Sequence, residues 1–191
     1  MNPLPFARAD EVDAALPRIV AHLRTGGLLA YPTETVYGLG SRARLPDLQA
    51  LATKAGFGTP QRVTTGLDHR RLALLLAVLE RRGGLPFGDL DVFVNVTGGV
   101  RLVEPSTDLA VMAALVSSVA NRPVPADALF LGEVGLGGEI RPVAAIERRL
   151  AEAARQGFRR AFVSARSPLT ADGIEVVGMA GIGELAGRLA A

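Results

Sequence analysis

The spacing of apolar residues divides the first third of the chain into short helices and strands. Residues 9–25 carry apolar positions at helical spacing, and a pair of glycines ends that helix. The apolar run 28–31 predicts a buried strand, and the segment 45–55 predicts a second helix. Glycine and proline then interrupt the pattern at 56–60, so we place a domain boundary there.

Beyond this break the pattern again alternates between helical and extended spacing. The strands 91–96 and 100–103 straddle two glycines and predict a β-hairpin, and the run GEVGLGGEIRP predicts a second, tight hairpin. The order of elements predicts an α/β (α+β) fold without internal repeats. The other predicted elements are helices at 68–82, from 105 onward, at 143–156 and at 181–190, and strands at 160–164 and 174–177.

The composition describes a soluble globular protein. The 191 residues, 49% of them apolar and 21% charged, are enough to bury a core. The absence of cysteine excludes disulfides, zinc ribbons, iron–sulfur clusters and thiol nucleophiles. No apolar run reaches membrane-spanning length, and the N-terminus lacks a signal-peptide pattern. We expect a cytoplasmic protein with no membrane, metal or cofactor partner.

The basic residues are almost all arginines, and they are unevenly distributed. Lys54 is the one lysine among 21 basic residues, so lysine chemistry has a single candidate position. The net charge of +2 is too small to indicate nucleic-acid binding. Between residues 141 and 166, however, seven arginines stand against two glutamates. Such a segment is either a solvated helix face or a phosphate-binding surface. Helical spacing predicts that Arg148, Arg149 and Arg155 point outward.

The sequence from residue 61 to the C-terminus resembles a bacterial domain family. The segments QRVTTGLDHRRLALLLAVLERRGG and GEVGLGGEIRPVAAIERRLAEAARQGF are similar to the C-terminal, Lon-protease-like domain of the RadA/Sms DNA repair family. The resemblance implies a Lon proteolytic-domain-like fold, related to ribosomal protein S5 domain 2. It also implies a ring-forming homo-oligomer that contacts single-stranded or branched DNA, without sequence preference, in recombinational repair. The candidate DNA-binding residues are Arg148, Arg149, Arg155, Arg159 and Arg160.

The same resemblance bears on catalysis. In active Lon-type proteases a lysine on a later helix activates the serine of a G-P-S-A-G turn. Here the matching turn is EPSTD, whose serine is Ser106, and the lysine position falls at Glu147. No lysine follows Lys54, and a guanidinium cannot serve as the base. We therefore expect Ser106 to begin a helix rather than act as a nucleophile. The nucleotide-binding pattern G-x-x-x-x-G-K-[ST] is also absent, so no ATPase is expected.

Residues 9–55 resemble a different family through the run PTETVYGLG. This run is similar to the start of the YrdC family of threonylcarbamoyl-adenylate synthases, which prepare a tRNA modification from threonine, bicarbonate and ATP. Glycine replaces the arginine of the family's K-x-R motif, and most of its sheet is absent, so we expect an inactive αβα remnant. The vestigial substrate-binding positions are Thr33, Glu34, Thr35, Tyr37 and Lys54.

The two resemblances predict a chain of two parts: an incomplete YrdC-like fragment at 1–57 and a RadA-type domain at 58–191. The predicted function is DNA binding and oligomeric scaffolding in recombinational repair, without independent catalysis. Three alternatives stay open at this point. They are threonylcarbamoyl-adenylate synthesis by the N-terminal part, Lon-like serine peptidase activity through Ser106, and no function, as in a recombined gene.

Overall fold

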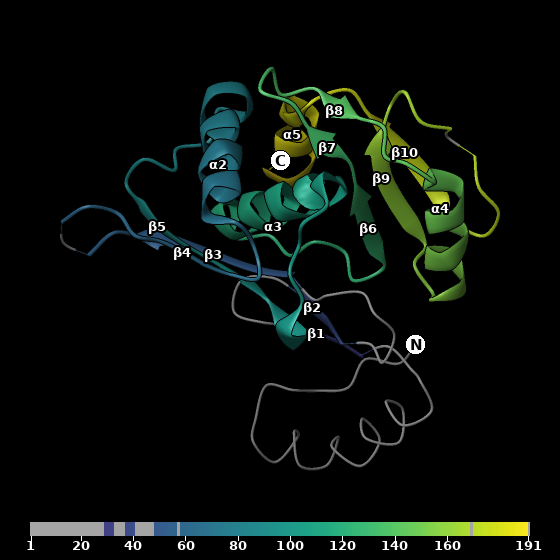
Figure 1. Ribbon diagram of the computed structural model, residues 1–191, viewed down its shortest axis with the longest axis horizontal. Helices are drawn as coiled ribbons and strands as arrows, with labels where there is room; N and C mark the ends of the chain where they lie inside the picture. The colour runs from purple at the N-terminus through teal and green to yellow at the C-terminus, as the bar shows by residue number, and fades with distance from the viewer. Residues whose placement is uncertain (1–28, 33–36, 41–47, 57, 169, 191) are drawn as a thin grey trace, which may run out of the picture.

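A computed structural model describes residues 29–32, 37–40, 48–56, 58–168 and 170–190 (Figure 1). The predicted helix at 9–25 lies outside the described residues. In chain order the elements, in which η marks a short 3-10 helix, are β1 (Leu29–Pro32), β2 (Tyr37–Gly40), β3 (Leu48–Lys54), β4 (Arg62–Thr65), α2 (His69–Gly83), β5 (Leu90–Val96), η1 (Thr97–Gly99), η2 (Pro105–Thr107), α3 (Asp108–Ala120), β6 (Ala128–Leu131), β7 (Glu133–Val134), β8 (Ile140–Arg141), α4 (Ile146–Arg155), β9 (Arg160–Ser164), β10 (Glu175–Met179) and α5 (Ile182–Ala190).

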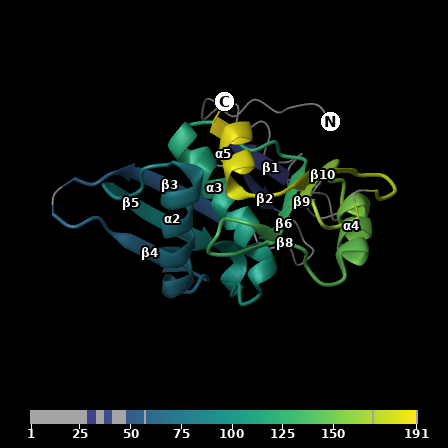
Figure 2. The same ribbon diagram turned by 90° about the horizontal axis from the view of Figure 1, so that it is seen from above.

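Two three-stranded sheets organise the described part of the chain. In the first, β5 is central and pairs antiparallel with β3 and parallel with β4. In the second, β9 is central and pairs parallel with both β6 and β10. Seen from above, the first sheet lies at one end of the molecule and α4 at the other (Figure 2). The mixture of parallel and antiparallel strands with helices confirms the predicted α/β class.

Helix α3 lies between the two sheets and contacts both (Figure 1). Its residues from Val111 to Ser117 are all buried, so the helix has no solvent-facing side along two turns. One core cluster joins it to Val92 and Val94 of β5 and to Phe130 and Phe162 of the second sheet. The two phenylalanine rings stack with centroids 4.6 Å apart.

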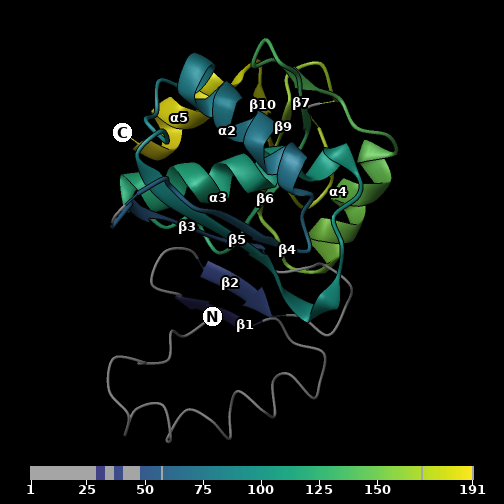
Figure 3. The same ribbon diagram turned by 60° about the vertical axis from the view of Figure 1, so that its left-hand side comes forward.

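Helix α4 covers the other face of the second sheet (Figure 3). Ile146, Leu150 and Ala153 of the helix form a second core cluster with Ala161 and Val163 of β9. Side chains alternate across a strand, which explains why Phe162 faces α3 while its two neighbours face α4. The second sheet is therefore apolar on both faces, as parallel sheets usually are.

The helices after residue 60 begin and end close to where the sequence predicts them. Asp68 caps α2 by accepting a hydrogen bond from the Arg71 backbone N–H, and Gly84 ends it in the left-handed conformation at φ 68°. The predicted strands at 160–164 and 174–177 correspond to β9 and β10, and the terminal helix to α5. The run GEVGLGGEIRP forms the antiparallel hairpin of β7 and β8, as predicted.

The prediction of a helix at 45–55 was wrong, because the residues 48–54 form strand β3. Ala50 is buried in the core, whereas Leu51 and Thr53 are exposed, which is the alternation of a strand. All seven residues pair with β5, and the Ala52 backbone N–H donates to the Ser118 hydroxyl of α3 at 2.8 Å. Tertiary pairing here outweighs local helix propensity. Strand β3 precedes the predicted boundary at 56–60 and shares a sheet with strands that follow it.

The predicted hairpin of 91–96 with 100–103 was also wrong. Strand β5 forms, but β3 and β4 occupy both of its edges, so no edge is left for a returning strand. The chain turns through η1, and Leu102 instead makes an isolated parallel bridge to Leu67. The Leu102 backbone N–H donates to the Gly66 carbonyl at 2.7 Å.

The helix predicted from residue 143 begins three residues later. Ala145 adopts the left-handed conformation at φ 53°, which a right-handed helix cannot include. The helices in the part of the chain that the structure describes are too short or too polar to span a bilayer.

Candidate functional site

Ser106 lies in η2, at the turn that leads into α3. Its backbone carbonyl accepts a hydrogen bond from the Gly132 N–H at 2.9 Å, and the Leu109 N–H donates to the Gly132 carbonyl at 3.1 Å. These bonds attach η2 to the end of β6. Only 4% of Ser106 is exposed. The predicted position of Ser106 at the start of a helix is confirmed.

The side chain that reaches Ser106 is Arg149 of α4, not Glu147. The Arg149 Nη1 lies 3.4 Å from the Ser106 hydroxyl, a long hydrogen bond. The same guanidinium forms an ion pair with Glu104 through Nη2 and donates from Nε to the Ala144 carbonyl at 3.0 Å. Glu147, at the position that the sequence resemblance aligned with a catalytic lysine, is exposed.

This arrangement does not suit a serine nucleophile. A guanidinium stays protonated and cannot remove the hydroxyl proton. Lys54 pairs in register with Leu90 at the end of β3 and has no hydrogen bond to Ser106. Within the described residues, Ser106 and Arg149 thus form a structural connection between η2 and α4.

The interpretation of Arg149 as outward-facing was wrong, because it is half-buried between α4 and η2. Arg148 and Arg155 are exposed, as the helical spacing predicts. Helical phase alone gave no signal for the contact with Ser106, because the two residues are 43 positions apart in the sequence.

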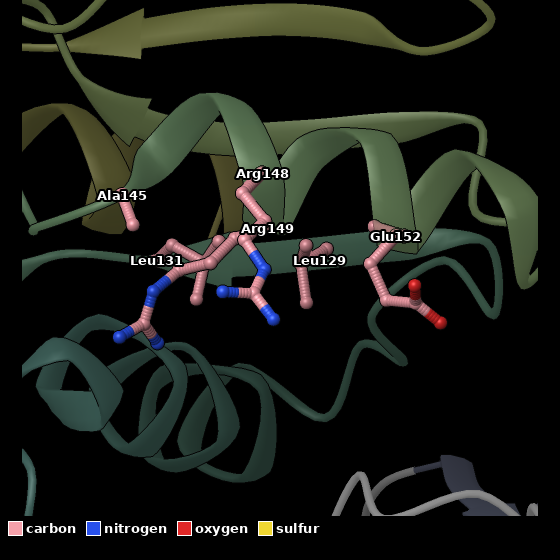
Figure 4. A pocket seen from close by; sticks show the side chains of 7 residues that line it. Leu129, Leu131, Ala145, Arg148, Arg149 and Glu152 are labelled. Carbon is pink, nitrogen blue, oxygen red and sulfur yellow. The ribbon is translucent and has the colours of Figure 1, made fainter.

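A pocket of about 350 Å³ opens beside this contact, between α4 and β6 (Figure 4). Leu129 and Leu131 of β6 form its apolar side, and the side chains of Arg148, Arg149 and Glu152 extend over it from α4. Ala145 and Ala153 complete the lining.

The pocket exists because α4 packs over the middle of the second sheet rather than over its edge. Ala161 and Val163 of the central strand β9 are fully buried beneath the helix. Leu129 and Leu131 lie on the same face of the edge strand β6, and they are only half-buried. The two leucines are therefore reachable from solvent.

The fold pairs four of the seven arginines in the segment 141–166 with acidic side chains. Arg141 contacts Glu133 at 3.2 Å and Glu139 at 2.6 Å, and the hydrogen bond to Glu139 raises the pKa of Arg141. The other pairs are Arg149 with Glu104, Arg155 with Glu152, and Arg160 with Glu175.

Three arginines of this segment form no ion pair with any residue that the structure describes. They are Arg148, Arg159 and Arg166, and all three are exposed. The local positive excess read from the sequence is therefore smaller in three dimensions, and it is concentrated on these side chains.

An ion pair that sequence analysis missed connects α2 to α3. The Asp108 side chain is 3% exposed; it accepts from Arg71 through both oxygens and from the Val134 backbone N–H at 3.1 Å. The hydrogen bond to Asp108 raises the pKa of Arg71. Helical periodicity gave no signal for this pair, because Arg71 and Asp108 are 37 positions apart in the sequence.

The predicted N-terminal substrate positions fall partly outside the described residues. Thr33, Glu34 and Thr35 lie outside them. Tyr37 begins β2, and Lys54 is exposed at the end of β3. These positions and the division of the chain at 57 stay predictions.

Comparison with known proteins identifies a matching family and several similar proteins. Residues 61–167 match the family described as subunit ChlI of Mg-chelatase. The chain is 56% identical to DNA repair protein RadA of Pseudomonas aeruginosa over 124 residues, 65% of this chain and 27% of that protein. It is 51% identical to DNA repair protein RadA of Escherichia coli over 142 residues, covering 73% of this chain and 31% of that protein.

A more distant relative matches over a longer stretch. DNA repair protein RadA of Bacillus subtilis is 46% identical over 149 residues, 76% of this chain and 32% of that protein. The chain thus spans less than a third of the length of each of these three relatives.

Proposed function

The chain belongs to the family described as subunit ChlI of Mg-chelatase, and we propose that it serves RadA-type DNA repair as a non-proteolytic, DNA-binding scaffold domain. The observation that carries this proposal is the identity of 46% to 56% with three proteins named DNA repair protein RadA. The stretch that matches the family, residues 61–167, includes η2, α4 and the pocket between α4 and β6. The proposal extends to a Lon-like, S5 domain 2-like fold and to a ring-shaped homo-oligomer without its own ATPase.

The contacts of Ser106 support the non-proteolytic part of the proposal. Its hydroxyl is buried and faces a guanidinium that is itself paired with Glu104. A serine hydroxyl needs a base to become nucleophilic, and neither neighbour supplies a neutral amine.

The unpaired arginines support the DNA-binding part. Arg148 and Arg159 are exposed and carry no acidic partner among the described residues, so their charges are available to phosphate oxygens. Arg155 and Arg160 are already engaged with glutamates, and a phosphate would have to displace these. We therefore assign the stronger phosphate contacts to Arg148 and Arg159.

The test is a salt titration of binding to a fluorescent single-stranded oligonucleotide, with the assembly mass measured in parallel. Sequence-independent binding that falls steeply with salt is expected, because each neutralised phosphate releases counterions. The double variant Arg148→Ala/Arg159→Ala should flatten the salt slope by about one unit per lost phosphate contact.

Arg141→Ala is the matched control, since it removes a charge from the same segment but from an arginine held by two glutamates. Its salt slope should change less than the slope of either single variant, Arg148→Ala or Arg159→Ala. If the salt slope of binding were the same in the unchanged protein and in all the variants, Arg148 and Arg159 would not be the phosphate-binding surface.

A further inference from the structure

We propose that the pocket between α4 and β6 receives one base of a single-stranded nucleic acid, while Arg148 holds the adjoining phosphate. This inference rests on the proposed function and specifies the ligand: an unpaired nucleotide rather than duplex backbone alone. At about 350 Å³, the pocket falls within the roughly 300–1,000 Å³ range of ligand sites.

The apolar side of the pocket fits the flat face of a base. Leu129 and Leu131 stand two positions apart on one face of β6, so their side chains lie side by side. Both leucines are half-buried in the protein. A ring that covers them removes apolar surface from water without moving the sheet.

The charges around the pocket fit an anionic ligand. Arg149 is neutralised by Glu104, and Glu152 by Arg155. Arg148 is the lining residue whose charge has no partner among the described residues. One base and one phosphate of the same nucleotide satisfy the apolar side and the unpaired cation together.

An extended peptide that adds to β6 is the rival occupant, and the edge of β6 argues against it. The strand has four residues, and the following Gly132 is already bonded through its N–H and its carbonyl to Ser106 and Leu109. Few backbone groups are left for the ladder on which strand addition depends.

The experiment compares two oligonucleotides that share a backbone, one of twenty thymidines and one with abasic sites in the central positions. The full chain should bind the base-bearing strand about fivefold more tightly, the low end of what a base contact contributes, because the leucines lack aromatic rings. Arg148→Ala should weaken binding and also abolish this preference. Arg159 is exposed, lies outside the pocket and has no acidic partner among the described residues. Arg159→Ala should therefore weaken binding to both strands by the same factor.

A second readout locates the base. In protein with ¹³C-labelled leucine methyl groups, the signals of Leu129 and Leu131 should shift on addition of the thymidine strand and stay in place with the abasic strand. Leucine-to-valine variants at the two positions assign the signals and keep the fold testable.

Equal affinity for the two strands would overturn the inference and leave phosphate binding as the proposed function. Leucine shifts produced by an apolar, acidic peptide but not by the thymidine strand would assign the pocket to a protein partner instead. Absence of binding to either strand would overturn the pocket inference and the DNA-binding proposal together.

Discussion

At the scale of single residues, the informative contacts join positions far apart in the sequence. Asp108 receives hydrogen bonds from α2 and from β7, and Arg149 connects α4 to η2. Both residues lie on helices whose presence the sequence predicts correctly. Their partners could not be predicted, because periodicity describes which face a residue occupies and not what the fold places against that face.

We expect Asp108→Ala to lower the free energy of unfolding by about 3 kcal/mol, since it leaves the partly buried Arg71 and the Val134 N–H without their acceptor. Urea denaturation measures the change. Asp68→Ala, which removes only the exposed cap of α2, is the control and should lower it by about 1 kcal/mol. Equal losses in the two variants would contradict the structural role of Asp108.

Ser106 should not react with a fluorophosphonate probe under conditions that label an active serine hydrolase, because its hydroxyl is buried and no described residue beside it can act as a base. Arg149→Lys is the sharper test, since it places an amine where the guanidinium stands. Glu104 should keep that amine charged, so we again expect no labelling. The peptidase alternative would be revived if the Arg149→Lys variant were labelled and the double variant Ser106→Ala/Arg149→Lys were not.

At the scale of elements, the sequence predicts the helices better than the strands. Helix α2 carries its own start signal in Asp68 and its own stop signal in Gly84. Its apolar stripe can be recognised without knowing which elements pack against it. Strand β3 has no such local signal, and alanine and leucine favour a helix there. Its conformation is decided by the edge that β5 offers it, 36 or more residues later.

A chain that begins at residue 58 should be less stable than one that begins at residue 47, although the sequence pattern places a boundary at 56–60. The shorter chain lacks β3, which exposes an edge of β5 and the core contacts of Ala50. Urea denaturation and size-exclusion chromatography should show a lower midpoint and self-association. Identical midpoints would support the division at residue 57.

At the scale of the whole molecule, sequence predicts the α/β class and the order of most elements but not how the layers are arranged. The run of apolar residues in α3 indicates a buried helix. That it is buried between two sheets depends on β3 and β6, which belong to different sheets and both contact it. The pocket could not be predicted from the sequence either, because it arises from the position of α4 over β9.

Because both sheets share α3, neither can lose its packing without exposing the same helix. We therefore expect one cooperative transition, in which the described part of the chain unfolds as a unit. Amide hydrogen exchange measures this directly: protons of α3 should exchange only through global opening, while those of α4, which covers a single sheet face, exchange through smaller fluctuations. Faster exchange in α3 than in α4 would show that the two sheets open independently.

A shared central helix would also let a ligand bound at β6 slow amide exchange in the distant strand β3.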